Sequence, residues 1–214
     1  MSQRGKTFRL YIRGPNACFT RPEMKVERVS YEVPTPSAMR GVLEAIFWKP
    51  AFRWVIERID VLKPIRWETI RRNEVGSRAS PRSGHLIIED HRQQRATLLL
   101  REVAYVVHAH QELTGKESEG NDLGKLMGIF ERRASKGQYF HHPYLGTREF
   151  AVEEFRLLEA DETLPAVELD KDLGWMLYDL DFSIPKKPIP LFFQAQLQQG
   201  TLHIPHPDSE EVKR

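Results

Sequence analysis

Histidine pairs are the residues of this chain whose types and spacing most readily support chemistry. His141 and His142 are adjacent in the segment 138–144, and histidine suits general acid–base work near neutral pH; the alternative is that both are ordinary loop residues. His108 and His110 alternate in a strand-like run, so they share a face, but no nearby Cys or acidic cluster completes a metal site. We therefore expect no metal and no cofactor, and we interpret His110 as a packed sheet residue.

Basic residues form the second candidate set. Residues 1–149 carry 26 Lys and Arg against 17 Asp and Glu, whereas residues 150–214 carry 6 against 13. This asymmetry favours a first part that faces a polyanion, although charged residues also simply solvate a surface. Basic groups hold phosphates, and the candidate phosphate contacts are Arg21, Lys25, Arg28, Arg40, Lys49, Arg71, Arg72, Arg92 and Arg95.

Composition excludes several classes of protein. The chain has 214 residues, 40% of them hydrophobic, which is enough for one large domain, or one domain and a small appendage, with a real core. The single cysteine, Cys18, excludes an internal disulfide framework, and we expect it to be a small buried hydrophobe. No apolar run is long enough to cross a bilayer, and Arg9 and Arg13 interrupt the N-terminal pattern that a signal peptide needs. These observations predict a cytoplasmic protein without a membrane partner.

The order of elements that must position these residues is strand, helix, strands, helix, strand. Thr35 as N-cap and Pro36 at the first turn begin the first helix. We expect Trp48 and Trp54 to lie in the core, and a strand at 67–75 to pair with the one before it. The predicted elements span residues 6–13, 35–48, 52–62, 67–75, 96–113, 122–136 and 147–158, with a polar loop and a small hairpin between 76 and 95.

This order predicts an α+β fold: a ferredoxin-like, RRM-like domain with extended β-hairpins over residues 1–160. Residues 161–214 are expected to add a small antiparallel sheet and, after Pro207, a frayed tail. The strand-like runs of this second part cover residues 174–182, 189–197 and 201–204.

Several motifs in this order resemble one known family. The segments 17–31 (Ala-Cys-Phe-Thr-Arg-Pro-Glu-Met-Lys-Val-Glu-Arg-Val-Ser-Tyr) and 34–50 are similar to the type I-C (subtype d) branch of the fifth Cas family, within the RAMP superfamily. Further similar motifs, which together span most of the chain in the right order, are Arg71–Val75, Arg92–Ala96, Gly124–Lys125, Leu145–Phe150 and Pro190–Phe193.

The resemblance implies a fold, an activity and partners. Members combine a ferredoxin-like domain with a small C-terminal sheet, bind the hairpin of CRISPR repeat RNA and cut at its 3′ base. The cut needs no metal, because the 2′-OH of the RNA attacks the adjacent phosphate and leaves a cyclic phosphate and a 5′-OH. The protein then stays on the 5′ handle of the crRNA with the other subunits of the type I-C interference complex. DNA stays open as a further partner.

The resemblance also assigns catalytic positions, and this chain departs from them. The family uses a Tyr or His near the end of the first helix and a Lys-His pair on the second, which correspond to Phe47, Lys125 and Leu126. Only Lys125 keeps a group that can hold a phosphate charge or transfer a proton, while Phe47 can only stack. Either His141 or His142 replaces the missing groups beside Lys125, or the protein has lost cleavage and only caps the crRNA handle.

Two alternative functions would each require a motif that this sequence does not contain. A generic RNA-recognition module would need two aromatic motifs on its central strands, and a metal-dependent nuclease would need an acidic constellation; the sequence shows neither.

Overall fold

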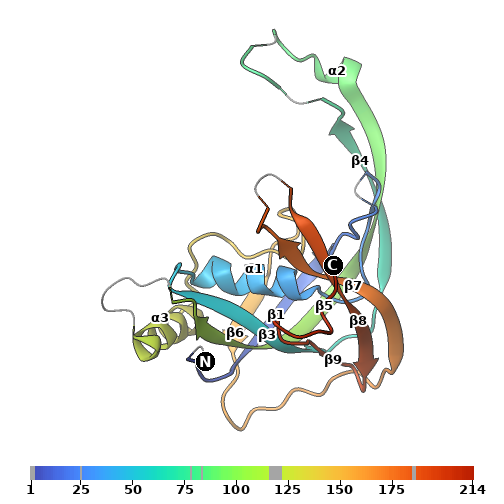
Figure 1. The fold of residues 1–214 in the computed structure, drawn as a ribbon. Helices are drawn as coiled ribbons and strands as arrows, with labels where there is room; N and C mark the ends of the chain where they lie inside the picture. The colour runs from blue at the N-terminus through green and yellow to red at the C-terminus, as the bar shows by residue number, and fades with distance from the viewer. Residues whose placement is uncertain (1–2, 25, 78, 83, 116–121, 185–186) are drawn as a thin grey trace.

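The computed structural model describes residues 3–24, 26–77, 79–82, 84–115, 122–184 and 187–214 (Figure 1). These residues form one nine-stranded sheet with the strand order β6-β1-β5-β3-β9-β8-β7, and β2 and β4 also pair with β5. The strands are β1 (Phe8–Ala17), β2 (Arg28–Val29), β3 (Phe52–Val61), β4 (Trp67–Val75), β5 (Arg92–Leu113), β6 (Glu154–Leu157), β7 (Lys171–Asp181), β8 (Ile189–Gln198) and β9 (Thr201–His203). The helices are α1 (Pro36–Ile46), α2 (Ile88–His91) and α3 (Leu123–Ser135). An α+β fold dominated by an antiparallel sheet is therefore confirmed.

The core lies between the central strands and the two longer helices. β1 alternates buried and half-buried residues, and Phe8, Leu10 and Ile12 all point to the buried side. The ring of Phe8 packs edge-on against Trp54 of β3 and against Phe130 of α3, with centroids 5.9 and 4.9 Å away. Burying each such side chain contributes about 1.5–3 kcal/mol, so these contacts fix α3 against the sheet.

The first helix begins as expected and ends earlier. The Thr35 hydroxyl accepts a hydrogen bond from the Ala38 N–H at 3.2 Å, which satisfies one of the free donors of the first turn. The helix stops at Ile46 because Phe47 is extended. Trp48 therefore leaves the buried face and is 53% exposed, so its predicted core position is wrong, whereas Trp54 is buried as predicted. Among the described residues, no helix is long and apolar enough to cross a membrane.

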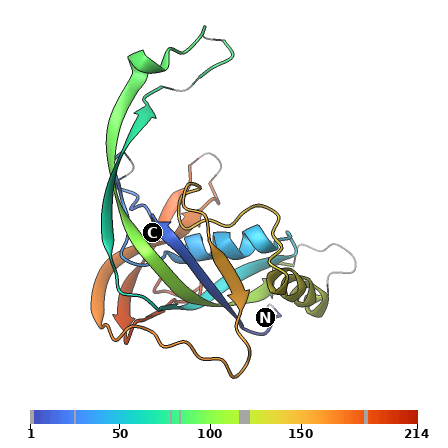
Figure 2. The same cartoon turned by 180° about the vertical axis from the view of Figure 1, so that it is seen from behind.

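The 22-residue strand β5 carries a long arm (Figures 1 and 2). Its second half pairs with β1 and β3, and its first half pairs with β4. The predicted pairing of β4 with β3 is therefore wrong. Glu102, within β5, has φ of +52°, a left-handed conformation that is uncommon for a residue other than glycine. The first half of β5 and β4 project from the body as a two-stranded arm with α2 near its tip.

The strand predicted at residues 147–158 begins with a short turn instead. The strand expected at 147–158 is confined to β6, because the Phe150 N–H bonds back to the Thr147 carbonyl at 3.0 Å. Gly146 has φ of +86°, and a Cβ there would lie 2.0 Å from the Cys18 carbonyl oxygen. This close approach requires glycine and seats the turn on the end of β1, where Cys18 is fully buried as predicted.

The C-terminal strands continue the same sheet. β9 pairs with β3 from Arg58↔His203 to Asp60↔Thr201, so residues 161–214 join the first part by strand pairing, and the division at residue 160 stays a prediction. The predicted frayed tail is wrong. Lys213 exchanges two backbone hydrogen bonds with Phe192 at 2.7 and 2.8 Å, and these bonds tie the end of the chain to β8.

Candidate functional site

The second helix presents one of the predicted catalytic residues to solvent and buries another. Lys125 lies in the first turn of α3 and is exposed, and no ion pair joins it to any described residue. Leu126, the next residue, is 0% exposed and belongs to the core. Consecutive residues of a helix point about 100° apart, so a core contact at 126 leaves the ammonium of Lys125 free to meet a ligand.

Phe47 is also closed to a ligand. It is 3% exposed, and its ring stacks on Phe52 with centroids 5.5 Å apart. The guanidinium of Arg133 covers the ring, 5.2 Å from its centroid, and Arg133 Nη1 donates to the Ile46 carbonyl at 3.0 Å. Phe47 therefore stacks inside the protein, on Phe52, and its buried ring is not open to a ligand. Arg133, which the sequence analysis did not single out as a site residue, caps the carbonyl end of α1 there.

His141 and His142 lie beyond the other end of α3. Both are exposed, and His142 Nδ1 donates to the Pro143 carbonyl at 2.9 Å. Lys125 and Ser135 are ten positions apart in α3, which corresponds to about 15 Å along the helix axis. Phe140, next to His141, is then bonded through its N–H to the Ala45 carbonyl near the end of α1 at 2.8 Å. The structure therefore does not bring either histidine to Lys125, and their predicted shared site divides into two places along α3.

Several predicted phosphate contacts already have carboxylate partners. Arg40 of α1 makes ion pairs with Glu44 at 2.8 Å and with Asp179 of β7 at 2.9 Å. A guanidinium held by two carboxylates offers little charge to a phosphate. Arg40 therefore ties α1 to β7, and it does not present a free cation.

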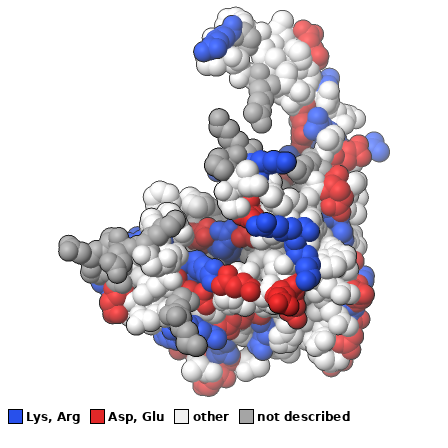
Figure 3. All heavy atoms as spheres, in the orientation of Figure 1, with Lys and Arg blue, Asp and Glu red and all other residues white. Residues whose placement is uncertain are grey.

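A second paired group lies at the base of the arm. It shares two carboxylates, Glu74 of β4 and Glu149, among three arginines: Arg28, Arg72 and Arg95. This network fixes β2 and the turn at 147–150 against the arm. On the face drawn in Figure 3, basic and acidic side chains lie side by side below the arm.

The outward face of the arm carries unpaired cations. Arg71 lies opposite Ala96 and Arg92 lies opposite Val75, so both exposed arginines point to the same side of the hairpin. Neither has an ion-pair partner among the described residues. Trp67, 40% exposed, lies on the same side of β4. A face with free guanidinium groups and an aromatic ring fits a nucleic-acid strand.

The remaining predicted contacts lie nearer the body. The Arg21 guanidinium stacks over the Tyr31 ring, 4.4 Å from its centroid, and lies 3.9 Å from a Glu23 carboxylate oxygen. Lys49, just after α1, is half-buried and has no ion-pair partner in the described part of the chain. Lys25 lies outside the described residues.

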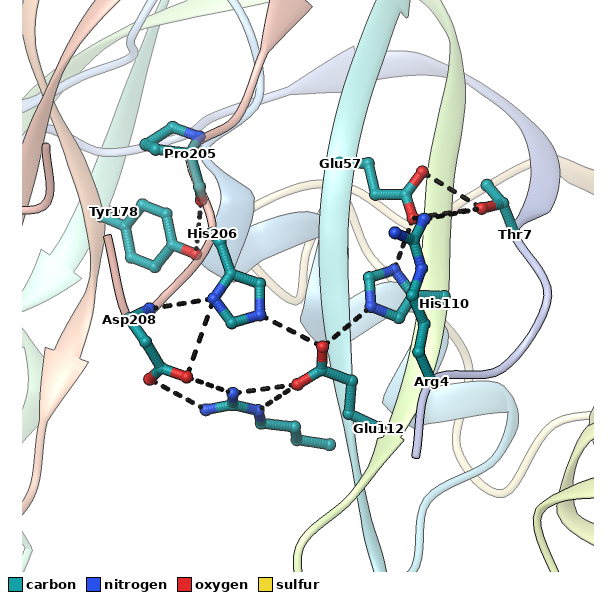
Figure 4. Close-up of polar contacts among 10 residues, drawn as sticks. Arg4, Thr7, Glu57, His110, Glu112, Tyr178, Pro205, His206 and Asp208 are labelled. Carbon is teal, nitrogen blue, oxygen red and sulfur yellow. Dashed lines mark hydrogen bonds and ion pairs between the residues drawn. The ribbon is translucent and has the colours of Figure 1, made fainter. Parts of the chain in front are cut away.

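The sheet face opposite the helices holds a charge network that the sequence reading did not find (Figure 4). His110 of β5 lies between two carboxylates, with Nδ1 2.5 Å from Glu57 and Nε2 3.1 Å from Glu112. Glu112 also accepts from Arg53 of β3 at 2.9 Å and contacts His206 Nε2 at 3.1 Å. His110 is 3% exposed, so its interpretation as a packed sheet residue is confirmed. His108, His110 and Glu112 alternate along one strand, and this spacing could have predicted that the three side chains share one face of the sheet.

Glu112 is the centre of this network. Burial raises the pKa of its carboxyl, but hydrogen bonds from His110, His206 and Arg53 outweigh burial and lower the pKa to about 2. Asp208 pairs with the same Arg53 at 2.8 Å. The network joins β3, β5 and the C-terminal segment, and within the described residues no cluster of three or more His, Cys, Asp or Glu has the arrangement of a metal site.

A cavity of about 530 Å³ lies between α1, the start of β3 and β7. Its wall contains the Arg40–Asp179 pair and two exposed aromatic rings, Trp48 and Phe182. None of the five predicted catalytic residues lines it, so this cavity is separate from the exposed Lys125 on α3.

Comparison with known proteins identifies relatives over nearly the whole chain. The model of a family described as CRISPR-associated protein, Cas5d, matches residues 7–205. The chain is 49% identical over 223 residues to the CRISPR pre-crRNA endoribonuclease Cas5d of Mannheimia succiniciproducens, covering 96% of this chain and 98% of the relative. It is 45% identical to the protein of the same name from Thermus thermophilus, covering 94% and 92% of the two chains.

Solved structures share the fold. A crystal structure of a CRISPR-associated protein aligns over 100% of both chains with a TM-score of 0.75 and 22% identity. A functionally uncharacterized protein of Streptococcus mutans aligns over 99% of both chains with a TM-score of 0.72 and 25% identity. A chain of a CRISPR RNA-guided surveillance complex aligns with a TM-score of 0.58 and 14% identity, over 97% of this chain and 91% of that one.

Proposed function

Since the chain belongs to the Cas5d family of CRISPR-associated proteins, we propose that it binds CRISPR repeat RNA and cuts it as a pre-crRNA endoribonuclease. The observation that carries the proposal is the near full-length identity, 49% and 45%, to two relatives that are both named for this activity. The exposed, unpaired Lys125 on α3 supports it from the structure.

The proposed reaction uses a nucleophile from the RNA. The 2′-oxygen attacks the adjacent phosphorus as the P–O5′ bond breaks; the 2′-OH loses its proton and the departing 5′-oxygen gains one. The products are a 2′,3′-cyclic phosphate and a 5′-OH. Lys125 stabilises the negative charge that builds up on the phosphate oxygens, which is the role of a preorganised cation in such a step. Phe47 and Leu126 take no part, because both are buried.

The RNA contacts follow from the unpaired cations. Arg71 and Arg92 on the outer face of the arm hold backbone phosphates, and Lys49 does so beside α1. Arg40, Arg72 and the other paired arginines position these elements and do not bind RNA directly. The nine predicted phosphate contacts are thus divided into unpaired cations that bind RNA and paired arginines that do not. The ion pairs Arg40–Asp179 and Arg72–Glu74 are examples of the second group.

We also propose a place for the protein in a larger assembly. A chain of an RNA-guided surveillance complex has a similar fold, and its name supports retention of this protein on the crRNA beside other subunits. The acidic segment 150–214 is a suitable surface for docking such subunits. Binding assays with duplex DNA test whether DNA is a further partner.

The first part of the chain is proposed to be ferredoxin-like. The strands β6-β1-β5-β3 lie in this order, all neighbours are antiparallel, and α1 and α3 connect β1 to β3 and β5 to β6. This is the arrangement expected for the split βαβ pattern. It supports the sequence-based assignment for residues 1–160.

A cleavage assay tests the proposed activity. The protein is mixed with end-labelled CRISPR repeat RNA of its own host in EDTA, and the products are mapped. One cut at the 3′ base of the hairpin, leaving a 5′-OH that polynucleotide kinase can label, supports the proposal. Tight binding without any cut supports the alternative, in which the protein only caps the 5′ handle. The buried Phe47 and Leu126 at two of the three family positions are the observation that favours that alternative.

A further inference from the structure

The segment after α3 displays aromatic rings that the core does not use. Phe140 is 86% exposed, and its neighbour Tyr139 is 44% exposed. Among the described residues, the ring of Phe140 has one ring contact, an edge-on approach to His141 with centroids 6.1 Å apart. Exposing a large apolar ring forgoes about 1.5–3 kcal/mol of burial, and this segment exposes two such rings side by side in the sequence.

The backbone holds this ring firmly in its exposed place. Gly137, with φ of +63°, ends α3, and the chain reverses through two hydrogen bonds: Gln138 N–H to the Arg133 carbonyl at 2.8 Å and Gly137 N–H to the Ala134 carbonyl at 3.3 Å. These two bonds form a Schellman motif. The Phe140 N–H then donates to the Ala45 carbonyl near the end of α1 at 2.8 Å. Phe140 is therefore anchored to two helices through its backbone while its side chain stays in solvent.

The neighbouring rings strengthen this platform. Tyr139 lies against His142 with centroids 4.9 Å apart, and His141 lies 6.4 Å from Tyr144. His142 is held by its bond to the Pro143 carbonyl. Ordered rings lose little conformational entropy on binding, so the loop is preorganised to stack on a flat ligand.

The charges beside the platform select the ligand class. Arg132 and Arg133 lie in the last turn of α3 and Lys136 is its C-cap. None of the three has a carboxylate partner among the described residues, in contrast to Arg40 and Arg53 of the body. Arg133 donates to the Ile46 carbonyl and covers the Phe47 ring. Aromatic rings beside unpaired cations fit a ligand with flat bases and a phosphate backbone.

We propose that Phe140 is the stacking residue for an unpaired base of the RNA, with the last turn of α3 holding the neighbouring phosphate. A side chain reaches the face of a base only where the base is unpaired, because paired bases are covered by their neighbours in the stack. The stem is therefore excluded, and we assign the platform to the single-stranded flank, because Lys125 on the same helix acts at the hairpin base, where stem and flank meet. This inference rests on the proposed function and names the part of the RNA that the loop binds.

Binding measurements with a Phe140 variant, its control variants and two RNA probes test the inference. Two probes are made from the host's repeat: the stem-loop with its single-stranded flanks, and the stem-loop alone, both with a 2′-deoxy nucleotide at the cut so that they stay whole. The dissociation constants are measured in EDTA for the wild type, Phe140→Ala, Phe140→Tyr and Phe182→Ala. Phe182 is a matched control, because it is 68% exposed and lies in the C-terminal part of the chain.

Phe140→Ala is expected to weaken binding of the flanked RNA about 5- to 150-fold, as loss of one stacked base predicts. Phe140→Tyr and Phe182→Ala should bind it like the wild type, and the stem-loop alone should bind Phe140→Ala and wild type equally. Unchanged affinity of Phe140→Ala for the flanked RNA, or an equal loss on both RNAs, overturns the inference while leaving the proposed function in place. Failure of the wild type to bind either RNA overturns both.

Discussion

The charge network around Glu112 and the exposed surface of α3 use similar side chains in opposite ways. In the network, Arg53 and His110 each contact at least one carboxylate, and the group lies across β3, β5 and the C-terminal segment. At α3, the exposed cations Lys125, Arg132 and the C-cap Lys136 have no carboxylate partner among the described residues. The first arrangement satisfies its charges internally, and the second leaves them for a ligand.

This difference separates the cations that stabilise the fold from those that are available to bind RNA. A paired, partly buried guanidinium holds elements together, and removing its partner leaves an uncompensated charge. An unpaired cation on the surface costs little stability to remove but contributes to binding a polyanion. The same rule separates Arg72 from its neighbour Arg71 on the arm, although the sequence presents them as one pair.

The largest expected effect lies on the structural side. Glu112→Ala removes the shared acceptor of Arg53, His110 and His206, and we expect it to lower the free energy of unfolding by about 3–5 kcal/mol. Urea unfolding followed by circular dichroism measures this. Asp90→Ala, on the exposed helix α2, is the matched control and should be neutral. A Glu112→Ala protein as stable as the control would show that the network does not hold the fold.

The next effect lies on the functional side. Lys125→Ala should lower the single-turnover rate of RNA cleavage about 10²- to 10³-fold, the usual loss when one preorganised group for developing charge is removed. Its melting temperature and most of its RNA affinity should persist, because the side chain is exposed. Lys63→Ala, which changes an exposed lysine between β3 and β4, is the control and should cut like the wild type. A cleavage rate within twofold of wild type would remove Lys125 from the site.

The two classes of arginine should differ in salt dependence. Arg71→Gln should reduce the slope of log affinity against log salt by about 0.7–0.9, because one phosphate contact is lost. Arg40→Gln should leave the slope unchanged and instead lower the melting temperature, since Arg40 bridges α1 and β7. Fluorescence anisotropy titrations at four salt concentrations measure both slopes. Equal slopes for Arg71→Gln and wild type would place Arg71 outside the interface.

The smallest effect is the acid dependence of stability. The pKa of Glu112 is about 2 in the folded protein, below its usual value of 4.5. A carboxyl with a lowered folded pKa contributes stability that is complete above its unfolded pKa and is lost as the pH falls toward the folded value. Stability should therefore decline between about pH 5 and 2, and less steeply in Glu112→Gln. Parallel declines for wild type and Glu112→Gln would contradict the pKa shift of Glu112.

The sequence predicted the positions of the helices and strands better than it predicted which strands pair. Thr35 and Pro36 marked the start of α1, and apolar periodicity located α3, because caps and helical faces are local properties. The partner of β4 was missed, since the sequence does not show that β5 is long enough to pair with β4, β1 and β3. Trp48 was misplaced because the helix ends two residues before it, and helix ends are the least certain boundaries.

The candidate site was predictable in its residue types and not in its arrangement. The resemblance selected Lys125, and the segment 138–144 was singled out for its histidines. The exposure of Phe140 was not visible, because a Schellman motif and a bond to Ala45 set it. The pairing of Arg72 and Arg95 with Glu74 depends on strand register, which one sequence does not reveal.

The most direct test of the central claim is single-turnover cleavage of two RNAs in EDTA. One is the host's repeat RNA, and the other is the same RNA with one 2′-deoxy nucleotide before the cut. The account predicts one cut in the first RNA and none in the second at equal binding, because the 2′-oxygen is the nucleophile. Cleavage of both RNAs at the same rate, or of neither at full binding, would contradict it.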